Sequence, residues 1–177
     1  DYLIHQEGEM SFTGLLQSFV GLKSDEDVPG ISINRNGKTL MTGPSQRIMD
    51  LSEVPSPYTM GLFDHLDEMY PGKIWNAVIE TNRGCPFMCT FCDWGGTTFS
   101  KVKKFGLERI QEELDWMGEN KIEMLTNTDA NFGIFKDRDM EITDMLIRTK
   151  KKYGFPVLFD TNWSKNATVQ LVDMAVK

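Results

Sequence analysis

The feature that most constrains the fold is an alternation that runs from residue 74 to the end of the chain. A β-rich stretch, a polar loop and a segment with helically spaced apolar residues follow one another three times. The three β-rich stretches are residues 74–80, 121–126 and 156–160. Strand–loop–helix repeats form parallel strands joined by right-handed crossovers. The sequence therefore predicts an α/β fold for residues 74–177.

The loops that follow these strands carry the unusual polar residues of the chain. They span residues 81–100, 126–137 and 161–166. In parallel sheets, functional residues gather at the carboxyl ends of the strands. All three loops are therefore expected along one edge of the sheet, and we expect the functional site there.

The first 73 residues do not follow this strand–loop–helix alternation. Residues 1–22 join a short β-rich run to a helically patterned segment, which is typical of the last strand and helix of an α/β domain. Residues 23–73 contain two β-rich runs around Asn36-Gly37, a strong hairpin signal, and then a linker rich in Pro and Ser. The predicted organisation is thus 1–22, 23–73 and 74–177. Because the chain opens without Met in what reads as the middle of a fold, we expect a fragment.

All three cysteines lie in the loop after the first strand of the alternation. Cys85, Cys89 and Cys92 have the spacing CxxxCxxC. Three thiols cannot all pair and no secretory signal precedes them, so a disulfide framework is not indicated. Reduced thiolates that bind a metal explain the cluster better, and they indicate a cytoplasmic protein.

Two kinds of metal centre suit three thiolates. A structural zinc site needs a fourth ligand, and the two remaining candidates, His5 and His65, lack ligand-like spacing. An iron–sulfur cluster held by three thiolates keeps one iron without a protein ligand, where a substrate or cofactor can coordinate. The residues favour the cluster, and zinc stays as the alternative.

The net charge and the hydropathy of the chain argue against nucleic acids and membranes as binding partners. The formal net charge of −7 argues against a nucleic-acid binder, which normally carries a basic face. Short basic runs such as residues 101–104 are more typical of solvated loops. No apolar run reaches the roughly 18 residues that span a membrane. We therefore expect no nucleic-acid partner and no membrane association.

The string ETNRGCPFMCTFCDW (80–94) resembles the radical S-adenosylmethionine (SAM) superfamily, in particular members with an N-terminal cobalamin-binding domain. DANF (129–132) resembles the Asp-x-Asn-Phe segment that follows their second barrel strand, and residues 1–16 resemble the end of their cobalamin domain. The resemblance implies a partial (β/α) radical-SAM-type barrel of about three units. It would be preceded by the tail of an α/β cobalamin-binding-like domain and a β-hairpin linker.

The resemblance also implies roles for individual residues. Cys85, Cys89 and Cys92 would ligate a 4Fe-4S cluster whose open iron binds SAM. Six further residues are expected at the cofactor, near its adenine, ammonium or ribose groups: Phe91, Asp93, Thr126, Asp129, Asn131 and Asn162. Asp and Asn are also common turn and cap residues in such loops. Lys165 reads as a surface lysine.

The expected function is that of a radical SAM enzyme, which cleaves SAM reductively to a 5′-deoxyadenosyl radical and carries out cobalamin-dependent methyl transfer or rearrangement. The alternatives are a methylthiotransferase without cobalamin and a non-catalytic zinc or iron–sulfur binding module. Expected partners are an unidentified small-molecule or peptide substrate and an external electron donor such as flavodoxin or ferredoxin. Much of the cobalamin domain and of the barrel would lie outside residues 1–177. We therefore expect the isolated chain to be inactive and to fold poorly.

Overall fold

The computed structural model describes residues 1–87, 89–92 and 101–176. These residues form two compact units, which divide between Met49 and Asp50. Within the described ranges, no helix combines the length and the apolar character that a membrane span requires.

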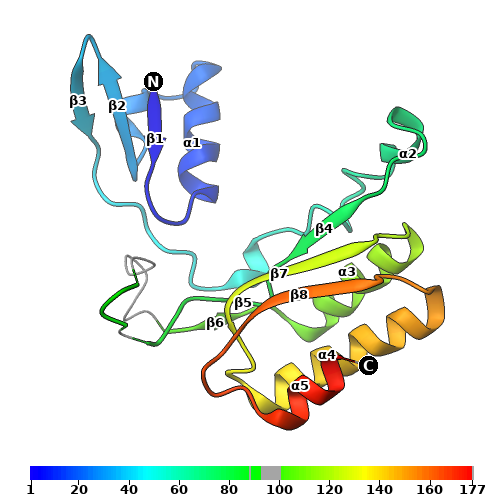
Figure 1. Ribbon diagram of the computed structural model, residues 1–177. Helices are drawn as coiled ribbons and strands as arrows, with labels where there is room; N and C mark the ends of the chain where they lie inside the picture. The colour runs from blue at the N-terminus through cyan, green and yellow to red at the C-terminus, as the bar shows by residue number, and fades with distance from the viewer. Residues whose placement is uncertain (88, 93–100, 177) are drawn as a thin grey trace. The chain divides into compact units, whose positions relative to one another are not determined.

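The first unit is a small antiparallel sheet with one helix (Figure 1). It contains β1 (Tyr2–Ile4), α1 (Glu9–Phe19), η1 (Asp25–Asp27), β2 (Ile31–Arg35) and β3 (Lys38–Met41), with strand order β1-β2-β3. Asn36 and Gly37 both have positive φ angles, 52° and 78°, as a two-residue hairpin turn of the primed type requires. The predicted hairpin is therefore confirmed. The buried core of this first unit consists of Leu15, Val28, Ile31 and Ile33.

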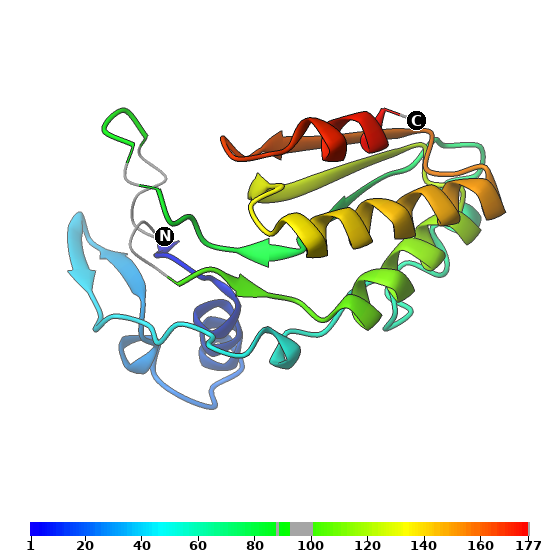
Figure 2. The same ribbon diagram turned by 90° about the horizontal axis from the view of Figure 1, so that it is seen from below.

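The second unit is built on a parallel sheet with the strand order β4-β7-β8. Its elements are η2 (Leu51–Glu53), α2 (Leu66–Met69), β4 (Asn76–Ile79), β5 (Asn82–Arg83), β6 (Lys103–Lys104), α3 (Leu107–Glu119), β7 (Met124–Phe132), α4 (Lys136–Tyr153), β8 (Leu158–Trp163) and α5 (Val169–Ala175). Helices α3, α4 and α5 lie on one face of the sheet (Figures 1 and 2). The predicted parallel α/β arrangement is confirmed.

The two faces of this sheet have different environments. Ala77, Ile79 and Leu125 share one face by the parallel register and strand alternation, and because all three are buried, this is the face that the helices cover. Val78, Thr126 and Asp160 stand opposite one another in the parallel register, so their side chains share the other face. Val78 is 53% exposed there. The face away from the helices is therefore open within the described residues.

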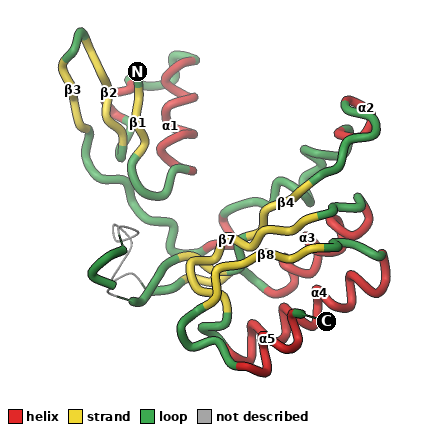
Figure 3. The backbone as a smooth tube through the Cα atoms, in the orientation of Figure 1, coloured by secondary structure: helices red, strands yellow, loops and turns green. Residues whose placement is uncertain are grey.

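Strand β7 is longer than the sequence predicts. We expect a strand over 121–126 followed by a loop, but the strand continues to Phe132 (Figure 3). Its buried positions include Asn127, Asp129 and Asn131, so polar residues occupy places where a period-two pattern normally shows apolar ones. The loop prediction for residues 127–132 is wrong for this reason. Strand β8 likewise continues past Asp160 to Trp163.

The predicted linker covers the outer edge of β4. The Tyr58 hydroxyl donates to the Val78 carbonyl at 2.6 Å and accepts from the Val78 amide at 3.0 Å. The Tyr58 ring packs against Phe63 and Trp116. One side chain therefore replaces part of the missing strand neighbour at this edge.

Candidate functional site

The cysteine loop leaves the carboxyl end of β4 and closes at its base. Strands β5 and β6 pair there, Asn82 with Lys104 and Arg83 with Lys103. Just outside this pair, the Phe105 amide donates to the Thr81 carbonyl at 3.0 Å. We call these two paired segments, residues 81–83 and 103–105, the neck. The neck fixes where the loop that holds all three cysteines begins and ends.

A buried carboxylate on β7 holds the first strand of the neck. Asp129 Oδ1 accepts from the backbone amides of Thr81 and Asn82, at 2.6 and 2.9 Å. Its Oδ2 accepts from the Thr81 hydroxyl and from Asn82 Nδ2. Burial raises the pKa of Asp129, and these hydrogen bonds act in the opposite direction. Asp129 therefore ties the start of the cysteine loop to the middle of the sheet.

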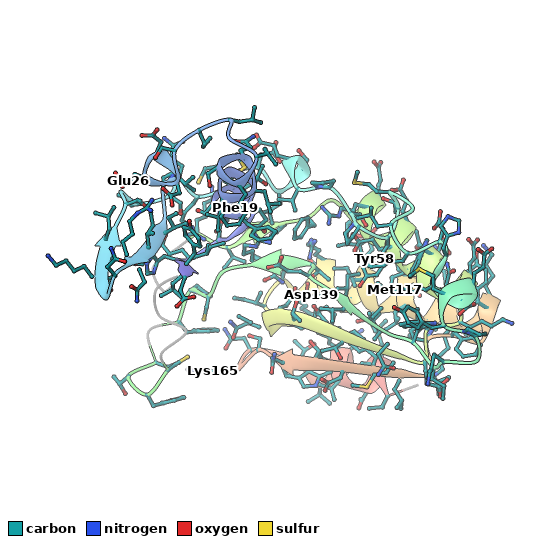
Figure 4. The ribbon with its side chains drawn as sticks, turned by 90° about the horizontal axis from the view of Figure 1, so that it is seen from above. Phe19, Glu26, Tyr58, Met117, Asp139 and Lys165 are labelled. Carbon is teal, nitrogen blue, oxygen red and sulfur yellow. The ribbon has the colours of Figure 1, made fainter. Side chains whose placement is uncertain are left out.

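A partly buried guanidinium on α4 holds the neck from the other side. Arg138 Nη2 donates to the carbonyls of Thr81 and Phe105, at 3.0 and 2.8 Å. Burial lowers the pKa of Arg138, and the neighbouring Asp139 carboxylate opposes this shift. Asp139, labelled in Figure 4, accepts from the amides of Gly133 and Phe135 and so closes the turn from β7 into α4. Sheet and helix thus converge on Thr81.

The three thiols occupy different environments. Cys85 is buried and accepts from Asn131 Nδ2 at 3.2 Å. Cys89 is partly exposed and lies 2.9 Å from Lys165 Nζ, on the loop after β8 (Figure 4). Cys92 is exposed, and its amide donates to the Cys89 carbonyl. Two of the three sulfurs therefore accept hydrogen bonds, one from β7 and one from the loop after β8.

The thiols do not converge on one point. Within the described ranges, no three Cys, His, Asp or Glu side chains lie close enough to share a metal ion. The donor type and number fit an iron–sulfur cluster with three thiolate ligands, and the N–H donors at Cys85 and Cys89 are of the kind that surrounds cluster sulfurs.

The residues predicted at the cofactor fall in several places. Thr126 and Asn162 lie on the open face of the sheet, since Thr126 pairs with Asp160 and Asn162 follows it by two positions. Phe91 is 88% exposed. Asp93 lies outside the described residues. Their roles toward the cofactor, like those of Asp129 and Asn131, stay predictions.

Two functional candidates escape inference from the sequence alone. Lys165 is exposed, as expected, yet its amine contacts a cysteine sulfur. Arg138 is the third residue of α4, where the positive end of the helix dipole disfavours a cation. A cation in this unfavourable position suggests that its side chain has a specific hydrogen-bond acceptor. The acceptors are the carbonyl oxygens of Thr81 and Phe105 in the neck.

The fold is shared with solved radical SAM proteins. The cobalamin-dependent SAM radical enzyme OxsB superposes with a TM-score of 0.60 at 18% identity, over 99% of this chain and 25% of that protein. The radical SAM methyltransferase TsrM of Kitasatospora setae, solved with cobalamin and a [4Fe-4S] cluster, gives a TM-score of 0.58 at 14% identity, over 86% of this chain and 30% of that protein. These likenesses define the fold.

No family model matches the sequence. The sequence is nonetheless similar over nearly its whole length to cobalamin-dependent radical SAM enzymes. It is 37% identical to the cobalamin-dependent radical SAM methyltransferase TokK of Streptomyces tokunonensis. It is also 37% identical to the 2-(S-pantetheinyl)-carbapenam-3-carboxylate methyltransferase of Streptantibioticus cattleyicolor. Each alignment covers 99% of this chain and 26% of the relative, so the chain spans about a quarter of their length.

Proposed function

We propose that this chain is the cluster-binding part of a cobalamin-dependent radical SAM methyltransferase. The observation that carries the proposal is the CxxxCxxC loop at the carboxyl edge of a parallel sheet, with hydrogen-bond donors at two of its three sulfurs. The two 37% identical relatives are both named methyltransferases, and this supports the reaction class.

The cofactors follow from this proposal. Cys85, Cys89 and Cys92 would hold a 4Fe-4S cluster, and the iron without a protein ligand would bind SAM. When bound, the cluster supplies one electron, which cleaves SAM to methionine and a 5′-deoxyadenosyl radical. Cobalamin would be bound by parts of the protein beyond this chain, with residues 1–22 as the tail of that domain. The protein contributes binding, orientation and exclusion of side reactions.

The residues of this chain divide that work between them. On the open sheet face, Thr126, Asp160 and Asn162 offer hydroxyl, carboxylate and amide groups to the polar parts of SAM. Under the cysteine loop, Asp129 and Arg138 hold the neck and so set the position of the thiols relative to that face. The open face would suit the inside of a barrel whose remaining strands would come from further parts of the protein.

The partners in this proposal are an electron donor and a substrate. One-electron chemistry needs an external low-potential donor, such as a flavodoxin or ferredoxin. The methyl acceptor would be a small molecule or peptide. Residues 74–177 would form the first half of the barrel, and residues 23–73 the hairpin and linker that precede it.

Metal analysis of the full-length protein tests the proposal. After anaerobic reconstitution with iron and sulfide, we expect about four irons and four sulfides per chain. Single Cys85→Ala, Cys89→Ala and Cys92→Ala variants are expected to lose most of this iron, while their melting temperatures show that the chain is folded. A protein that instead binds zinc tightly in a tetrahedral site and takes up no iron would contradict the proposal.

A further inference from the structure

We propose that Asn131 and Lys165 are positioning residues that act through the cysteine sulfurs, donating hydrogen bonds to them and raising the reduction potential of the bound cluster. This inference rests on the proposed function, since it concerns the same site. It adds Asn131 of β7 and Lys165 of the loop after β8 to the three cysteines.

Asn131 provides the sheltered donor. It is buried near the end of β7, and its Nδ2 lies 3.2 Å from the buried Cys85 sulfur. The neighbouring Phe132 is fully buried and packs against the rings of Phe159 and Trp163. Because water has little access there, the Asn131 amide keeps this contact without competition from solvent.

Lys165 provides the charged donor. Its Nζ lies 2.9 Å from the Cys89 sulfur and 5.0 Å from the centre of the Phe87 ring. One ammonium group thus donates directly to the sulfur of a proposed cluster ligand.

The effect on the cluster follows from charge. Reduction adds one electron to the cluster, so the reduced form gains more from nearby N–H groups and positive charge than the oxidised form does. The chain carries a net charge of −7, which opposes that added electron. Removing either donor should therefore make the cluster harder to reduce. The Lys165 change should have the larger effect because a cation is lost.

Lys165 also has a competing role that the test must separate. Its ammonium group could bind the carboxylate of SAM instead of a sulfur. In that case, its loss would weaken SAM binding and leave the potential of the SAM-free cluster unchanged. The two roles therefore differ in whether an effect is seen before SAM is added.

The experiment uses the reconstituted full-length protein and four variants. They are Lys165→Met, Lys165→Arg, Asn131→Leu and the control Lys151→Met, which alters an exposed lysine of α4. Iron and sulfide are counted first. The midpoint potential is then measured without SAM, in a dithionite titration followed by electron paramagnetic resonance, and SAM affinity is measured separately.

We expect Lys165→Met to lower the equilibrium constant for one-electron reduction roughly tenfold, which is about 59 mV. Asn131→Leu should shift it in the same direction by less. Lys165→Arg, which keeps a cationic donor, and Lys151→Met should retain the wild-type potential. Unchanged potentials in cluster-loaded Lys165→Met and Asn131→Leu would overturn the inference, as would a loss of SAM affinity alone for Lys165. A wild-type protein that takes up no iron would instead overturn the proposed function.

Discussion

At the scale of single residues, Thr81 is the point through which sheet and helix act on the cysteine loop. Its amide and hydroxyl bind Asp129 on β7, and its carbonyl accepts from Arg138 on α4. These contacts are buried or partly buried, so water replaces them poorly when a partner is lost. Substitutions of Asp129 or Arg138 should therefore change the positions of the three thiols, although neither side chain contacts a cysteine.

Asp129→Asn should destabilise the protein. An amide in place of the carboxylate turns an NH₂ group toward donors at Thr81 and Asn82 and leaves some of them unpaired. The expected loss in the free energy of unfolding is about 1–3 kcal/mol, the cost of buried groups without partners. Chemical denaturation measures it. An unchanged unfolding midpoint would show that the neck does not depend on this carboxylate.

The pH dependence of the same variant has a definite sign. Burial raises the pKa of Asp129 above 3.8, so the folded state binds this proton more readily than the unfolded state. Stability from this group therefore increases as pH falls through the raised pKa toward 3.8. Wild type should gain stability relative to Asp129→Asn when both are denatured at about pH 7 and about pH 4.5. A gap that moves the other way would contradict the burial effect.

Arg138→Met should impair cluster loading more than it impairs folding. Without the guanidinium, the Thr81 and Phe105 carbonyls lose the bridge across the neck, while their backbone bond remains. We expect less iron per chain after reconstitution and a melting temperature near that of the control. The control is Arg148→Met on the same helix, which removes an exposed ion pair with Asp144. If Arg138→Met and Arg148→Met bind equal amounts of iron per chain, Arg138 does not contribute to cluster loading.

Among the residues of the site, the sequence predicts those with a motif and misses those without one. The cysteine spacing marks the loop, and the cluster of Asp and Asn residues marks the end of β7. Arg138 lies 46 positions beyond Cys92 and belongs to no motif. Its role depends on α4 packing beside the neck, which only the folded chain reveals. Asp129 is expected at the cofactor, yet its oxygens are engaged by the neck.

At the scale of elements, β7 is the strand on which the site depends. It pairs with both β4 and β8, and its second half places Asp129 under the neck and Asn131 at Cys85. Alternating polarity predicts the helices and the three parallel strands but not this extension. Strand signals rely on apolar side chains, whereas here the buried positions are polar, and Asp129 and Asn131 are held by hydrogen bonds.

Tyr58→Phe tests the covered edge of β4. The change removes the hydroxyl that pairs with both backbone groups of Val78 and leaves the aromatic packing in place. We expect a loss of about 0.5–1.5 kcal/mol in unfolding free energy and faster aggregation on heating, because an unpaired strand edge recruits other chains. Tyr70→Phe is the matched control, since Tyr70 is an exposed tyrosine in the same unit. Similar aggregation of both variants would count against the role of Tyr58.

At the scale of the whole molecule, the sheet of the second unit has one face that the described residues leave open. The face away from its helices exposes Val78 and Leu158. An apolar face and free strand edges are usually covered by further structure. The chain spans about a quarter of the length of its curated relatives, which suits a role that needs the rest of the protein.

Residues 1–177 expressed alone should therefore behave poorly. We expect an aggregation-prone chain that binds less iron than the full-length protein, because the apolar face is uncovered and the loop lacks its surroundings. Size-exclusion chromatography and thermal melting measure this. A monomeric chain that melts cooperatively would contradict the prediction.

At this scale the parallel order of three strands and the placement of the cysteine loop at their carboxyl edge are predictable, because topology rules restrict how such repeats pack. The boundary between the two units is harder to predict from the sequence. Strand β1 pairs with β2 from the predicted hairpin region, a contact between distant segments that local patterns do not encode.

The most direct test of the central claim, that three thiolates of this chain hold a cluster with one open iron, is electron paramagnetic resonance. The reconstituted full-length protein is reduced with dithionite, and spectra are recorded with and without SAM. We expect the signal of a reduced 4Fe-4S cluster whose g values shift when SAM binds the open iron. A cluster signal that does not respond to saturating SAM would contradict the account.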